Sequence, residues 1–322
     1  MTFVLYRKLL RDVRVPLAAV SALLCLFAGL WVKVTVQVTT QIAPLLSLAG
    51  SLGKFGPTFF MDLFFNGPGK LIQTFLGGES VRFEDAQDTL AVVGTHPLVQ
   101  AIVCIWAIGR GAGAIAGEID RGTMELLLAQ PVARGKVILA HFLVDLTVIP
   151  ILCLALTAGI HIGVYIVGDF TVDPGVYEAV HMKPPNPLPT FKVNPNVVHP
   201  GMLNTAALLF AVSGFTMWLS AAGRSRTRVL GLAILVTLVQ FLVNVIGQLW
   251  DGLRMLRPLT VFYYYQPQAI NMRNNWLVDP GRVWTGHPTM TVNVVWVLVV
   301  VGAIGYLMAW RTFAKRDVPA PL

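Results

Sequence analysis

Apolar runs alternate with polar segments along the whole chain. A helix needs about 20 apolar residues to cross the hydrocarbon layer of a bilayer. Six runs approach or exceed that length, at residues 15–36, 97–117, 138–167, 203–222, 229–249 and 292–310. The pattern therefore predicts an all-α membrane protein with six transmembrane helices, built as a single domain over residues 1–322.

Composition agrees with this assignment. The chain is 55% hydrophobic and only 12% charged, with a mean hydropathy of +0.68, whereas a soluble domain is about one quarter charged. The net charge of +8 does not indicate a nucleic-acid surface, because the basic residues gather at the ends of the apolar runs. We expect a multi-pass protein of the plasma or inner membrane, with no nucleic-acid partner.

The basic residues also predict the orientation. Most of them lie before the first run, between the second and third, between the fourth and fifth, and after the sixth. They are Arg7, Lys8, Arg11, Arg14, Arg121, Arg134, Lys136, Arg224, Arg226, Arg228, Arg311, Lys315 and Arg316, with Arg110 reaching toward the same side from the second run. Because positively charged loops stay in the cytoplasm, both termini are expected there, and the loops 37–96, 168–202 and 250–291 outside.

Three stretches beside the runs have a character of their own. Residues 1–14 place Phe3, Tyr6 and Leu10 on one helical arc and basic residues on another. This predicts an amphipathic helix in the cytoplasmic interface before the chain turns into the first span, with a plain basic flank as the alternative. Residues 42–65, apolar but interrupted by Gly and Pro, are typical of a re-entrant or interface-lying segment. VFYYYQPQ, at 261–268, is typical of an aromatic belt, with a contact to substrate as the alternative.

Motifs for ATP or metal chemistry do not occur in the sequence. Without a G-x-x-x-x-G-K-[ST] motif, the chain is not expected to hydrolyse ATP or to hold a cofactor of its own. The histidines lack the H-E-x-x-H spacing of a zinc site, and Cys25, Cys104 and Cys153 lie in apolar runs as small buried residues. His141 and Asp145 form a possible intramembrane polar pair, four residues apart on one helix face. Such a pair is a functional candidate; a packed, hydrogen-bonded pair at a helix interface is the simpler interpretation.

The segment 117–136, GEIDRGTMELLLAQPVARGK, lies between the second and third runs. Gly122 and Thr123 can begin a helix there, and a proline shortly afterwards ends it. The resulting helix, residues 124–129, is too short to be stable alone in water. Its consecutive leucines must therefore pack against the protein's own spans or against a soluble partner; they are Leu126, Leu127 and Leu128.

These residues carry a resemblance to a known family. The run R-G-T-M-E-L-L-L follows a glutamate and precedes P-V-A-R and a basic residue that leads into the next span. Over residues 114–143 this resembles the signature region of ABC-2 type transporter permeases, and the six-span layout extends the resemblance less specifically to the whole chain. The matching positions are Glu118, Arg121, Gly122, Thr123, Glu125, Leu126, Leu127, Leu128, Pro131, Val132 and Arg134.

The resemblance implies the permease subunit of an ATP-binding-cassette exporter, which is not itself an enzyme. Its short helix would be a coupling helix that docks on a separate P-loop ATPase subunit, and that partner would bind ATP and Mg²⁺. The residues assigned to this contact are Glu118, Arg121, Gly122, Thr123, Glu125, Leu126, Leu127, Pro131 and Arg134. The other implied partners are membrane lipid and a second permease subunit, in a homodimer or a heterodimer.

Three other classes remain open from the residues alone. An ion-coupled secondary transporter would show an internal repeat and polar residues near the membrane midplane, but no clear repeat relates residues 1–167 to 168–322. A membrane enzyme would need a nucleophile or a metal cluster at one depth. A non-transporting membrane scaffold that only recruits a partner is compatible with the sequence.

Overall fold

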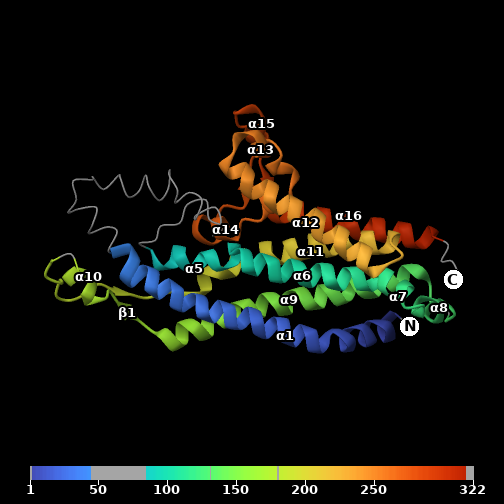
Figure 1. Cartoon of the computed structure of the whole chain (residues 1–322), viewed down its shortest axis with the longest axis horizontal. Helices are drawn as coiled ribbons and strands as arrows, with labels where there is room; N and C mark the ends of the chain where they lie inside the picture. Colours follow the sequence, from blue (N-terminus) through green and yellow to red (C-terminus); the bar gives the residue numbers. More distant parts are fainter. Residues whose placement is uncertain (1, 45–84, 131, 180, 317–322) are drawn as a thin grey trace.

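A computed structural model describes residues 2–44, 85–130, 132–179 and 181–316. Within them, six helical segments are long and apolar enough to cross a membrane, which confirms the predicted number of spans. The long helices are α1 (Thr2–Gln37), α6 (Pro97–Ala114), α9 (Arg134–Val167), α11 (His199–Ala222), α12 (Arg226–Leu249) and α16 (Val294–Lys315). The start of α1 and the end of α16 lie at the same end of the bundle, near α7 (Ala116–Asp120) and α8 (Thr123–Leu128) (Figure 1).

The first helix differs from the prediction at its start. α1 is unbroken, with Pro16 inside it, and a π-helical turn, η1 (Val38–Ile42), extends it. The chain therefore does not turn between an interfacial helix and the first span. In the apolar arc of the amphipathic start, Tyr6 and Leu10 pack against the main hydrophobic cluster, whereas Phe3 is 72% exposed. The Tyr6 hydroxyl hydrogen-bonds Thr147 of α9 at 2.9 Å. Amphipathic spacing predicts an apolar face, but a lipid interface and a neighbouring helix satisfy that face equally well.

The second span begins earlier than predicted. α5 (Ala86–Thr95) precedes α6 within the segment 37–96, which was expected to be an outer loop. The two helices are separated at His96, whose Nδ1 accepts a hydrogen bond from the N–H of Leu98 at 3.2 Å and so caps α6. A hydropathy profile does not show where one helix ends and a second, capped helix begins. Most of the predicted re-entrant segment falls in residues 45–84, outside the described residues.

The other spans lie where the apolar runs predict them, but their helices continue further. α9 begins at Arg134 and α16 reaches Lys315. Arg and Lys have a high helix propensity, so a helix continues through them, whereas a span predicted from hydropathy ends before them. The 34 residues of α9 span roughly 51 Å at the rise of an α-helix. This exceeds a hydrocarbon layer of about 30 Å, so α9 is long enough to project beyond it.

Glycines allow two helix pairs to approach closely. α1 packs along α9, and α11 packs along α16. A Cβ atom on Gly159 of α9 would collide with the backbone of Cys25 in α1. Gly214 of α11 faces Gly302 of α16 in the same way. Small residues at such positions bring backbones together and so increase the van der Waals contact that holds helices together in lipid.

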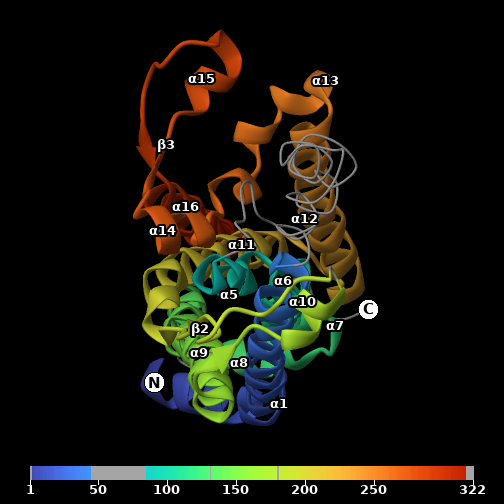
Figure 2. The same cartoon turned by 90° about the vertical axis from the view of Figure 1, so that its left-hand side faces the viewer.

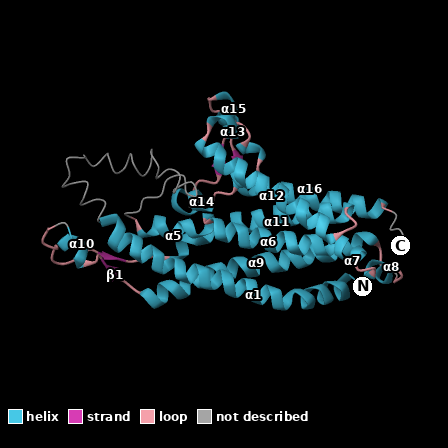
Figure 3. Ribbon diagram, viewed as in Figure 1, coloured by secondary structure: helices cyan, strands magenta, loops and turns pink. Residues whose placement is uncertain are grey.

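The segments between the spans form small elements. They are β1 (Phe170–Thr171), α10 (Pro174–Ala179), β2 (Thr190–Phe191), η3 (Pro195–Val198), α13 (Asp251–Arg254), η4 (Arg257–Leu259), η5 (Val261–Tyr264), α14 (Pro267–Arg273), β3 (Leu277–Val278), α15 (Pro280–Thr285) and β4 (Val292–Asn293). β1 pairs antiparallel with β2, and β3 with β4. α13 and α15 stand away from the bundle (Figure 2), and helices dominate the described chain (Figure 3). The fold is α-helical, as predicted, with two short antiparallel strand pairs added.

Candidate functional site

A break at Ile115 separates α6 from α7, and Ser220 of α11 occupies it. The Ser220 hydroxyl accepts hydrogen bonds from the backbone N–H groups of Ile115 at 3.1 Å and Ala116 at 3.0 Å, and donates to the Ala112 carbonyl at 3.3 Å. Ser220 is fully buried. An N–H group without a partner is costly in the buried interior of the bundle. These hydrogen bonds therefore stabilise the direction in which α7 leaves α6.

Glu118 holds the turn between α7 and α8. Its carboxylate pairs with Arg121 at 2.5 Å and accepts a hydrogen bond from the Thr123 hydroxyl. Gly122 lies between them with φ of +70°, in the left-handed region that favours glycine. The structure therefore brings these four predicted site residues together, and their contacts with one another shape the turn.

α8 divides its apolar residues between the protein and the outside. Met124 is 1% exposed and packs in a cluster with side chains of α9, α11 and α16. Leu127 and Leu128 pack partly buried against the same cluster, whereas Leu126 is 71% exposed. Glu125 is also exposed. Of the two surfaces expected for the leucines, the protein's own helices receive Leu127 and Leu128, and Leu126 is directed outward.

Arg134, at the start of α9, takes part in a chain of contacts between helix ends. Its guanidinium donates to the backbone carbonyl of Arg316, and Arg316 donates to the carbonyls of Ala221 and Gly223, both at 2.8 Å. These carbonyls lie at the C-terminal end of α11, where unbonded carbonyl groups attract cations. Arg134 therefore joins α9 to α16, and Arg316 joins the end of α16 to α11. Pro131 lies outside the described residues.

Deeper in the bundle, Arg110 of α6 and Asp145 of α9 form a buried ion pair. Arg110 Nε lies 2.5 Å from one carboxylate oxygen and Nη2 bonds the other, with the two side chains 7% and 3% exposed. Nη2 also donates to the backbone carbonyl of His141 at 2.8 Å. The hydroxyl of Tyr306 donates to the carboxylate of Asp145 at 2.5 Å. Side chains of α6 and α16 thus meet on one carboxylate of α9.

This arrangement differs from the pair suggested by helical spacing. The ion-pair partner of Asp145 is Arg110, which points into the bundle rather than toward the membrane surface. His141 contributes its backbone carbonyl, and its buried Nδ1 has no hydrogen-bond partner among the described residues. Spacing shows which residues share a helix face, but not which residue of another helix faces them. Arg110 and Tyr306 stand out as polar groups within apolar runs, whereas Ser220 gives no comparable signal, since serine is common between packed membrane helices.

The titratable and thiol side chains do not form a metal centre in the described part of the chain. No group of three His, Cys, Asp or Glu side chains there is arranged to hold a metal ion. Cys25, Cys104 and Cys153 are free thiols. The polar side chains described above, such as Ser220, Arg110 and Asp145, instead join α6, α7, α9, α11 and α16 to one another.

A comparison with family models now decides the class. Residues 17–318 match the model described as ABC-2 family transporter protein. The chain belongs to the ABC-2 transporter family. The match begins within α1 and ends just after α16, so this ABC-2 domain takes in all six apolar helices. No curated protein matches the chain.

Family membership and the six apolar helices together make this ABC-2 chain a multi-pass membrane protein and the membrane component of a transporter. The resemblance carried by residues 114–143 is thereby confirmed for the family. Membership also implies that the chain associates with an ATP-binding subunit. The segment α7–α8 is the part of the described chain in which that resemblance is concentrated.

Proposed function

We propose that this ABC-2 chain is the permease subunit of an exporter, and that α7 and α8 dock on a separate P-loop ATPase subunit. The sequence contains no Walker A motif, so ATP and Mg²⁺ belong to the partner in this proposal. The observation that carries it is the placement of α8. Met124 and Glu118 hold this short helix in position, while Leu126 is directed outward. An apolar group held in advance in its binding geometry loses little conformational freedom when it docks.

The charges near α8 support the orientation that docking requires. Apart from Arg110, which lies in the internal ion pair, the basic residues of these segments lie in the first turns of α1, in the turn between α7 and α8, at the start of α9, around the junction of α11 and α12, and at the end of α16. Positively charged segments of this kind stay on the cytoplasmic side. We therefore place both termini and α8 in the cytoplasm, and the protein in the plasma or inner membrane.

The contacts of this region provide a route from the ATPase into the membrane. In the proposal, ATP-driven closure of the ATPase pair displaces α8. The cluster around Met124 couples α8 to α9, α11 and α16, and Ser220 couples α7 to α11. In the proposal, these helices switch between two packings, and the switch opens the transport path to one side of the membrane or to the other. The driving force is the difference in the free energy with which the ATPase binds the two packings. A second permease chain, identical or a sister, completes the path.

The test is to purify the tagged chain from its native membrane in a mild detergent and to identify the co-purified chains by mass spectrometry. We expect a P-loop ATPase in near-equal amount. Leu126→Asp should lower its recovery, because a central apolar contact is worth about 2 kcal/mol or more, a loss of affinity of roughly thirtyfold. The same measurement shows whether the second permease is identical or a sister chain.

Leu259→Asp is the matched control, because Leu259 is 70% exposed but lies in η4, far from α8 in the chain. It should leave ATPase recovery unchanged. Normal amounts of the Leu126→Asp chain in the membrane together with undiminished ATPase recovery would contradict docking through α8. Recovery of this chain without any ATPase, even after crosslinking, would instead favour a secondary transporter or a scaffold.

A further inference from the structure

A polar cavity of about 130 Å³ lies between α5, α6, α12 and the segment 257–275. α12 begins beside α7, where the N–H of Arg226 bonds Asp120, and the cavity lies against the other half of α12. It is therefore well separated from α8. Within VFYYYQPQ, Phe262, Tyr263 and Tyr265 are buried and line this cavity, so these three rings do not form an aromatic belt.

Neutral amides dominate the polar lining. Charged groups are in the minority: Asp88, Arg257 and Arg273. The amide side chains are Gln100, Asn244, Gln248, Gln266, Gln268 and Asn275. An amide offers both N–H donors and a carbonyl acceptor, and a hydroxyl group likewise donates and accepts. A wall of amides is thus complementary to a ligand that carries several hydroxyl groups.

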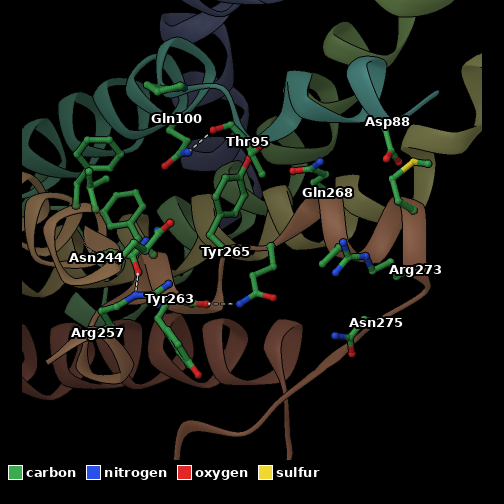
Figure 4. A pocket seen from close by; sticks show the side chains of 18 residues that line it. Asp88, Thr95, Gln100, Asn244, Arg257, Tyr263, Tyr265, Gln268, Arg273 and Asn275 are labelled. Atoms are coloured by element: carbon green, nitrogen blue, oxygen red, sulfur yellow. Dashed lines mark hydrogen bonds between the residues drawn. The ribbon is translucent and has the colours of Figure 1, made fainter. Parts of the chain in front are cut away.

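Two of these amides retain hydrogen-bonding capacity at the cavity. Gln268 is 8% exposed, and its side chain makes no hydrogen bond to the described residues. The amide nitrogen of Gln100 donates to the Thr95 carbonyl at 2.5 Å, but its oxygen has no partner in the described part of the chain. Figure 4 shows both side chains on the same side of the cavity as Thr95 and Tyr265. These amide atoms are not among the fully buried unpaired atoms of the described residues, so they are accessible from the cavity and can hydrogen-bond water or a ligand there.

The apolar part of the lining is aromatic. Phe241 and Phe262 meet edge to face with their centroids 5.4 Å apart, and Tyr263 lies under the guanidinium of Arg257, 5.5 Å from the ring centroid. Arg257 also donates to Asn244 at 3.4 Å, which positions that amide at the same wall (Figure 4). Flat rings suit the apolar face of another ring. The volume of about 130 Å³ is slightly below the roughly 150 Å³ of a cavity that holds benzene, so the cavity receives one face or edge of a sugar ring and not the whole sugar with its hydroxyl groups.

We propose that this cavity binds one neutral pyranose ring, as a free sugar or as the head group of a glycolipid. The aromatic side chains contact the C–H face of the ring. Gln268, Gln100 and Asn244 bond its hydroxyl groups, and these neutral contacts do not require a charged ligand. No docking of an ATPase is needed for this binding, so the inference stands apart from the proposed function.

The experiment is saturation-transfer NMR on the full chain in phosphatidylcholine nanodiscs, prepared without sugar-based detergent. The probes are methyl pyranosides of glucose, galactose, mannose and N-acetylglucosamine, with inorganic phosphate as a competitor for an anion site. We expect transfer to at least one pyranoside with a Kd of about 1 mM or tighter. Gln268→Leu and Gln100→Leu should each weaken that binding about tenfold, because each leaves a ligand hydroxyl unpaired. Gln130→Leu, on an exposed residue beside α8, should change nothing.

Gln268→Glu preserves the size of the side chain, and the thermal unfolding of each variant confirms that it is folded. An octyl glycoside of the same sugar separates the sources: equal affinity indicates a free sugar, and much tighter binding a glycolipid. The proposal is overturned if no pyranoside binds, if phosphate displaces the bound sugar, or if folded Gln268 and Gln100 variants bind as the parent does. Because binding is measured on this chain alone, a negative result leaves ATPase docking untouched, and failure of docking leaves this inference untouched.

Discussion

Asp145 of α9 holds the guanidinium of Arg110 on α6 with both of its carboxylate oxygens. A bidentate pair requires a specific orientation of both side chains. Neither helix can rotate or slide without separating the charges, and an isolated charge is costly inside a membrane protein. The hydroxyl of Tyr306 extends the constraint to α16. The pair therefore determines how three helices are placed relative to one another.

Removing one member of this pair should be more damaging than removing both. Asp145→Leu leaves the Arg110 guanidinium buried without compensation, and we expect it to destabilise the protein by about 3–5 kcal/mol. The double variant Asp145→Leu, Arg110→Met should recover most of that loss. Thermal unfolding in one detergent measures both. Equal losses in the two variants would show that charge compensation is not what the pair contributes.

Ser220→Ala should loosen the α6–α7 break. It removes the acceptor for the N–H groups of Ile115 and Ala116, and a buried donor without a partner costs about 1–3 kcal/mol. Hydrogen exchange should accelerate at these amides. The control is Thr216→Val on the same helix, because the Thr216 hydroxyl hydrogen-bonds the Val212 carbonyl within α11 and, among the described residues, no other helix. Unchanged exchange in Ser220→Ala would mean that other contacts hold the break.

Gly159→Ala should push α1 away from α9. Its methyl group would collide with the backbone of Cys25, which cannot move independently of its helix. Overpacking of this kind typically costs about 1–3 kcal/mol. Gly231→Ala in α12 is the control, since among the described residues no atom beyond its chain neighbours and its own helix backbone lies within 4 Å of the added Cβ, and it should stabilise by up to about 1 kcal/mol. Similar unfolding temperatures for the two variants would contradict the close approach.

The segment around α15 should respond to acid through Asp279. Its carboxyl pKa lies below the ordinary value, chiefly because the N–H of Thr289 donates to it, and the N–H of Arg282 adds to the effect. A lowered pKa in the folded state means that this support is complete above the ordinary pKa of 3.8 and disappears as the pH falls through the folded value. Hydrogen exchange of residues 280–290 should therefore rise only at acidic pH. Asp279→Asn, which cannot titrate there, should abolish that pH dependence, and a parent profile that is flat to acid would contradict it.

The sequence predicted the spans because their apolar length has one explanation, a passage through hydrocarbon. It predicted the short helix α8 from Gly122, Thr123 and the proline that follows, since the start and the end of a helix are local signals, but it did not predict α7 or the break at Ile115. It wrongly predicted a turn between the amphipathic start and the first span, because an apolar arc that faces lipid and one that faces α9 have the same spacing. It also missed α5, whose separation from α6 depends on the cap at His96 rather than on hydropathy.

By itself, then, the sequence determined the number of spanning helices, their approximate positions and the family resemblance of residues 114–143. Only the tertiary structure decided that Asp145 pairs with Arg110, that Ser220 closes the break at Ile115, and that Leu126 rather than Leu127 is directed outward. The physical reason is the range of the contacts. The bonding partners lie 35 and 105 residues apart in the chain, and helical periodicity describes a single helix without specifying which face of another helix it meets.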